Sequence, residues 1–131
     1  MTIEAQLAGL LTIGDNWNGE RSPAPSTDAV AAVTAILGTL TDAGLTPYSA
    51  GPDAEGGAGL WFASPQAKPH RTAWLYRTNA DWWVAMLTDH DDKTAGGVLS
   101  TNGPPASIIE AVAKFLRGGE PPHFNRVGLP T

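Results

Sequence analysis

The stretch from Thr72 to Thr88, TAWLYRTNADWWVAMLT, decides the fold class of this chain. Residues 72–78 and 82–88 are rich in aromatic and branched side chains, which is typical of β-strands. The three residues between them, Asn-Ala-Asp at 79–81, favour a tight turn. The stretch therefore predicts an antiparallel hairpin inside a sheet.

The length of the hairpin loop determines which side chains share a face of this sheet. With a three-residue loop, one face carries Trp74, Tyr76, Trp82 and Met86, whereas a two-residue turn would shift the pairing by one residue. With the same three-residue loop, the opposite face carries Ala73, Leu75, Arg77, Trp83, Ala85 and Leu87. A sheet covered on one face usually turns polar residues to the other, yet both faces here hold large apolar groups.

We therefore expect the face with Trp74, Tyr76, Trp82 and Met86 to contact a protein partner, a second copy of the chain or a small ligand. Six of the ten aromatic residues lie between positions 61 and 83, which is typical of either a sheet core or a recognition surface. The alternative is that a loop or the C-terminal segment covers this face.

Helix signals occur on both sides of the hairpin. Apolar spacing over residues 3–11 predicts a first helix with Thr2 as its N-cap, and a second should begin at Ser26 or Thr27 and end near Ala43. A final helix should follow Pro104 and Pro105 and stop at Gly118.

Short strands at 60–63 and 97–101 extend the hairpin. The prediction is an α+β fold with two N-terminal helices, an antiparallel meander of three to four strands, and one C-terminal helix. It forms a single domain over residues 1–118, followed by a Pro/Gly-rich tail over 119–131.

Two connecting segments are rich in turn-forming residues. In the first, residues 14–25, Trp17 is the one large apolar group; we expect it to insert into the core while Gly19 sets the entry to the second helix. The second, residues 46–58, is interpreted as a flexible connection. Within the second helix, Gly38 costs about 1 kcal/mol relative to alanine, so it suggests a close packing contact.

Composition excludes several function classes. The chain has 131 residues, no cysteine and a net charge of −5. Without cysteine there is no disulfide scaffold or thiolate chemistry, and the acidic balance argues against a nucleic-acid partner. We find no signal-peptide pattern and no apolar run long enough for a bilayer, so we expect a cytoplasmic protein with no membrane partner.

Charge is distributed unevenly along the chain. Residues 1–67 hold seven acidic residues and one basic residue, a net charge of −6, whereas residues 68–131 carry +1. An acidic region can favour a basic partner and speed the encounter with it. The simpler interpretation is that dispersed carboxylates keep the protein in solution.

Few residues could bind a metal or catalyse a reaction. The turn from Asp89 to Asp92 offers three carboxylates to a hard cation, but it lacks EF-hand spacing, and consecutive aspartates also simply favour turns. His70, His90 and His123 could form a three-histidine site, although turns and prolines surround them. We expect no cofactor, no metal and no enzymatic activity.

The order of several motifs resembles a group of small, largely uncharacterised bacterial and phage proteins. The matching features include Asn16-Trp17-Asn18-Gly19, a proline before a helix, and Gly56-Gly57-Ala58-Gly59-Leu60-Trp61, within residues 7–88. Asn18 stands where these proteins have aspartate. The resemblance implies an accessory gene of a mobile element, in some cases near toxin–antitoxin or defence loci, and it brings no catalytic residue.

These observations predict a non-catalytic protein-binding accessory module, antitoxin-, immunity- or anti-defence-like, that binds a protein partner or itself. The alternative is a small-ligand binder that stacks a nucleotide or a sugar on its tryptophans. A third, less favoured hypothesis is a metal-dependent enzyme that uses the loop from Asp89 to Asp92.

Overall fold

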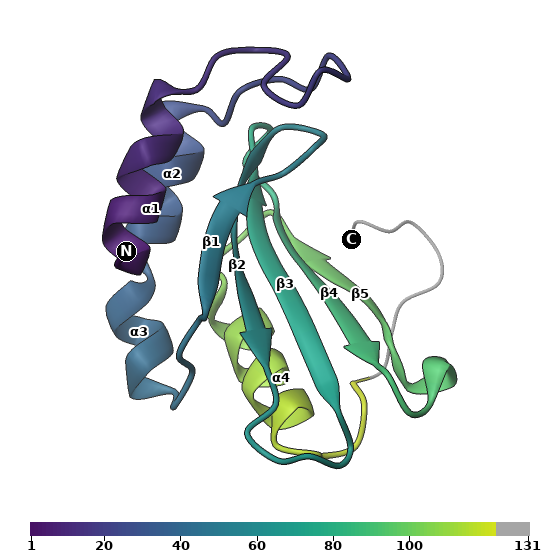
Figure 1. Ribbon diagram of the computed structural model, residues 1–131. Coiled ribbons are helices and arrows are strands. Elements are labelled where there is room, and N and C mark those ends of the chain that lie inside the picture. The colour runs from purple at the N-terminus through teal and green to yellow at the C-terminus, as the bar shows by residue number, and fades with distance from the viewer. Residues whose placement is uncertain (123–131) are drawn as a thin grey trace.

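The chain folds into a five-stranded antiparallel sheet with helices on one face, as a computed structural model shows for residues 1–122, the part it describes (Figure 1). The strands are β1 (Ser49–Pro52), β2 (Gly57–Ala63), β3 (Arg71–Thr78), β4 (Trp83–Asp89) and β5 (Gly97–Thr101). They lie side by side in chain order. The α+β prediction is confirmed, but the meander has five strands rather than three to four.

The unexpected strand is β1, which lies inside the segment interpreted as a flexible connection. Its sequence, Ser-Ala-Gly-Pro, has weak strand propensity. Pairing with β2 holds it in place, and the backbone N–H of Ala50 donates to the Gln6 side chain at 2.7 Å. Pro52 is tolerated because β1 is an edge strand. Tertiary contacts thus decide the structure of this segment, and the prediction that residues 46–58 form a flexible connection is wrong.

The helices are α1 (Ile3–Gly9), α2 (Thr27–Ala35), α3 (Leu37–Asp42) and α4 (Ala106–Leu116), with 3-10 turns η1 (Leu10–Thr12) and η2 (Lys93–Ala95). Thr2 and Ser26 accept hydrogen bonds from Ala5 and Ala29 and so act as N-caps, as expected. The expected single second helix is divided at Ile36, whose N–H donates to the Val33 carbonyl three residues back.

All helices contribute to one core on the same side of the sheet. Helices α1 and α2 lie beside β1 and β2, and α4 packs behind β3, β4 and β5 (Figure 1). The largest fully buried side chains are Phe62, Phe115, Leu7, Leu40, Leu60, Leu75, Val33 and Val112. Within residues 1–122 the helices therefore cover one face of the sheet and leave the other without a helical layer.

A buried ion pair joins the end of α4 to the sheet. Arg71 Nε donates to Asp89 at 2.8 Å, and Arg71 Nη1 donates to the carbonyls of Phe115 and Gly119 at 2.9 and 2.7 Å. The guanidinium also lies 4.3 Å above the Phe115 ring centre. Gly118, with φ of +87°, ends the helix region as predicted.

The predicted tail over residues 119–131 lies mostly outside the described residues, which end at 122. In the described part of the chain, no helix is both long and apolar enough to cross a membrane.

Gly38 makes no close contact, so the packing interpretation of this glycine is wrong: a Cβ at this position would meet nothing within 4 Å. We expect Gly38→Ala to raise the free energy of unfolding by about 0.5–1 kcal/mol, because it removes backbone freedom from the unfolded chain. Urea denaturation measures this change. Gly44→Ala is the matched control and should destabilise, because Gly44 has φ of +79° at the end of α3; a loss of stability in Gly38→Ala would contradict the prediction.

Candidate functional site

The register of the central hairpin places the predicted contact residues on one face. Trp74 pairs with Met86 and Tyr76 pairs with Val84, on either side of a three-residue loop at 79–81. The backbone N–H of Trp82 closes this loop by donating to the Thr78 hydroxyl at 3.0 Å. The predicted loop length and the predicted division of side chains between the two faces are both confirmed.

We call the side of the sheet without helices the open face. Its large side chains are Trp61, Trp74, Tyr76, Trp82, Val84, Met86 and Val98. Met86 is 46% exposed and Trp61 is 39% exposed, while Tyr76 and Trp82 are half-buried. Trp74 is only 6% exposed, so little of it could touch a partner directly.

Trp74 is buried because the open face folds its own aromatics together. Its ring stacks on Trp61 at a centroid distance of 4.7 Å and on Tyr76 at 5.7 Å. Its Nε1–H donates to Asp53 at 3.3 Å. The indole passes over Gly59, where a Cβ would come within 2.7 Å of it. Trp74 therefore supports the surface that Trp61 and Tyr76 present.

Trp61 is an exposed aromatic residue of this face that the hairpin sequence alone did not predict. The cross-strand pairing of Trp61 with Trp74 puts it there. Alternation along β2 was the available signal: Ala58, Leu60 and Phe62 are buried, while Trp61 between them is exposed. Because β2 begins with two glycines within its first three residues, this alternation of side chains is difficult to recognise in the sequence.

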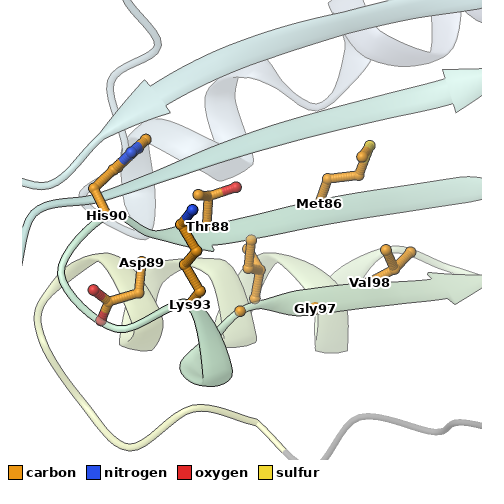
Figure 2. A pocket seen from close by; sticks show the side chains of 9 residues that line it. Met86, Thr88, Asp89, His90, Lys93, Gly97 and Val98 are labelled. Carbon is orange, nitrogen blue, oxygen red and sulfur yellow. The ribbon is translucent and has the colours of Figure 1, made fainter.

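Two hollows open on this face. The first, which we call the His90 hollow, has a volume of about 410 Å³ and lies along β4, η2 and β5. Figure 2 shows Thr88, His90 and Lys93 on one side of this strand end, with Asp89 on the other. His90 is held by stacking on His70 at 4.6 Å and by a 3.0 Å contact between its Nε2 and the Thr72 hydroxyl.

The second, which we call the Tyr76 hollow, has a volume of about 400 Å³. Its lining includes Asp53, Glu55, Tyr76, Asn79 and Trp82. Burial, followed by the charges of Asp53 and Glu55, raises the pKa of Tyr76 to about 12. The phenol of Tyr76 is therefore neutral at physiological pH, and it lies in the negative potential of Asp53 and Glu55.

Asn79 fixes one wall of the Tyr76 hollow by joining three turns. Its side chain accepts from Ser26 N–H at 2.7 Å and donates to the Ala24 carbonyl at 2.9 Å. Its own N–H donates to the Gly56 carbonyl at 3.2 Å. The sequence identified Asn79 only as a turn residue, because both side-chain partners lie more than 50 residues away.

The carboxylates from Asp89 to Asp92 build the turn rather than converge on a common point. Asp89 pairs with Arg71 and accepts from the N–H groups of Asp91 and Asp92. Asp91 accepts from His70 N–H, and Asp92 caps η2 through Thr94. Among residues 1–122 no group of three potential metal ligands occurs, and His123 of the three-histidine hypothesis lies outside these residues.

Trp17 is half-buried and is not part of the described core, so the expectation that it inserts there is wrong. Its Nε1–H donates to the Pro23 carbonyl at 3.1 Å, so this hydrogen bond joins two parts of the same loop, residues 14–25. Gly19 has φ of +76°, which suits the turn that this loop makes before α2.

No known family model, curated protein or solved structure matches this chain. The open face is therefore the feature of the molecule from which a function can be inferred.

Proposed function

We propose that this chain is a non-catalytic protein-binding module and that the open face is its contact surface. The observation that supports this proposal is the exposure of Trp61 and Met86 on a sheet face that no helix of the described residues covers. Large apolar side chains gathered on one surface are typical of protein interfaces, where aromatic residues and methionine are enriched.

The surface is also pre-organised for binding. The stack of Trp61, Trp74 and Tyr76, together with the Asp53 hydrogen bond, fixes the aromatic side chains before any partner arrives. Rigid side chains lose little conformational entropy on association, which favours affinity. We assign the module an accessory role of the antitoxin, immunity or anti-defence kind, supported by the sequence resemblance and by the acidic N-terminal half.

A site-specific crosslink tests this proposal. Because the chain has no cysteine, Met86→Cys gives a single attachment point for a photocrosslinker on the open face. We expect irradiation in an extract of the source cells to give one dominant adduct, identified by mass spectrometry as a partner protein or a second copy of the chain. Excess unlabelled wild-type chain should suppress it.

The matched control is Ala31→Cys, an exposed position on α2. With the identified partner purified, Met86→Glu and Trp61→Glu should each raise the Kd about tenfold or more, because a charge then lies in an apolar contact. Equal adducts from positions 31 and 86, or an unchanged Kd in both glutamate variants, would contradict the proposal.

A small-ligand binder is the second candidate, and the two hollows favour it. Each has a volume within the range of small-molecule sites, and the Tyr76 hollow has aromatic walls. A saturable change in tryptophan fluorescence on adding a nucleotide or a sugar would support this candidate.

A further inference from the structure

The Tyr76 hollow combines aromatic walls with an acidic rim. Tyr76 lines it from β3 and Trp82 from the position just before β4, and Val84 and Val98 add apolar surface. Asp53 and Glu55 line it from the turn between β1 and β2. Two aromatic rings and two carboxylates around one cavity form an environment that suits an organic cation.

The two carboxylates differ in their freedom to bind. Asp53 already accepts from Trp74 Nε1–H and from the backbone N–H of Glu55, which fixes its position. Glu55 is exposed, and within residues 1–122 neither carboxylate forms an ion pair with a basic side chain. Their charge is therefore available to an incoming group.

The basic residue that follows Tyr76 in the chain already has interaction partners on the other face of the sheet. Arg77 faces the core side, where its guanidinium lies 5.2 Å from the Trp83 ring centre and its Nη2 lies 3.4 Å from Asp81. Among the described residues, the lining of the hollow includes Asp53 and Glu55 and no basic residue. Burial is the larger cause of the raised pKa of Tyr76, and the charges of these two carboxylates add to it. The potential inside the hollow is thus negative.

We propose that the Tyr76 hollow receives an arginine side chain of the protein partner, with its guanidinium against Tyr76 and Trp82 and its N–H groups directed to Glu55. Arginine fits better than lysine because its planar group stacks on aromatic rings while donating several hydrogen bonds. This inference rests on the proposed protein-binding function and specifies the partner's chemistry: a basic residue must adjoin the apolar patch that covers Trp61 and Met86.

Two small probes test the inference without a partner. N-acetyl-arginine methylamide carries the guanidinium, and N-acetyl-citrulline methylamide has nearly the same shape without the charge. In spectra of the ¹⁵N-labelled full chain, the arginine probe should shift the Trp82 indole signal saturably in the millimolar range, and the citrulline probe should not. Glu55→Gln should raise the Kd of the arginine probe about three- to fivefold.

Glu110→Gln is the matched control, because it removes the same charge from the exposed side of α4. It should leave the Kd unchanged. Trp82→Ala, followed through the backbone amide signals of Thr78 and Asn79, which also line the hollow, should raise the Kd up to about tenfold. Equal shifts from both probes, no saturable shift, or an unchanged Kd in Glu55→Gln would overturn the inference.

These outcomes are separate from those of the crosslinking experiment. If the arginine probe fails while position 86 still crosslinks specifically, the arginine site is wrong and the protein-binding function stands. If the probe binds as expected but position 86 gives no specific adduct, the hollow binds a small cation and the protein-binding function is wrong.

Discussion

Arg71→Met is expected to lower the Tm by about 10 °C or more. The Arg71 side chain is 8% exposed and supplies the counter-charge to a carboxylate that is 3% exposed. Methionine keeps much of the side-chain volume but leaves Asp89 without its guanidinium and removes the Arg71 donor from the carbonyls of Phe115 and Gly119. An unpaired buried charge is among the most destabilising changes a core can undergo, and thermal unfolding by circular dichroism will measure it.

The effect should depend on pH. The hydrogen bond from Arg71, supported by the N–H groups of Asp91 and Asp92, holds the pKa of Asp89 below its ordinary value. A carboxyl with a lowered pKa stabilises the fold above its unfolded pKa of about 3.9, and this stability is lost as the pH falls through the folded pKa. Without Arg71 this stabilisation is smaller, so the Tm difference between wild type and variant should narrow below about pH 4.

Arg77→Met is the matched control for this pair. Arg77 and Asp81 are 3.4 Å apart, and the Asp81 side chain is 72% exposed. Solvent screening makes such a pair worth at most about 1 kcal/mol, so the Tm should change by a few degrees. If Arg71→Met destabilised no more than Arg77→Met, the buried pair would not be what joins α4 to the sheet.

The difference between these two arginines shows which features a sequence can predict. The hairpin at 72–88 was predicted correctly because strand alternation and loop length are local properties. The burial of Arg71 was not predicted, since its partners are 18, 44 and 48 residues away in the chain. β1 was missed for the same reason: its position depends on β2 and Gln6, not on its own residues.

The same distinction between local sequence properties and contacts distant in the chain applies to the open face. The sequence predicted that Trp74, Tyr76, Trp82 and Met86 share a face, and the register confirms this. It could not predict their depth, because the burial of Trp74 depends on the missing side chain of Gly59 and on a hydrogen bond to Asp53. Their contact with a partner remains a prediction, and Met86 and Trp61 are the residues that test it because both are exposed whereas Trp74 is buried.

Trp74→Ala is expected to lower the free energy of unfolding by about 3–5 kcal/mol, the largest effect of any truncation on the open face. The change removes a nearly buried indole from between Trp61 and Tyr76 and leaves a cavity over Gly59. It also removes the donor to Asp53. Urea denaturation of the purified chain measures the loss.

Trp61→Ala is the matched control, since it removes the same side chain from the exposed end of the same stack. Trp61 is 39% exposed, so its loss should cost about 1 kcal/mol, mainly through the lost ring contact. Equal losses in the two variants would mean that Trp74 is not the support of the open face. If instead Trp74→Ala is far less stable while Trp61→Ala stays folded, a binding defect in Trp61→Ala reports lost contact with the partner, whereas one in Trp74→Ala reports a surface that has lost its shape.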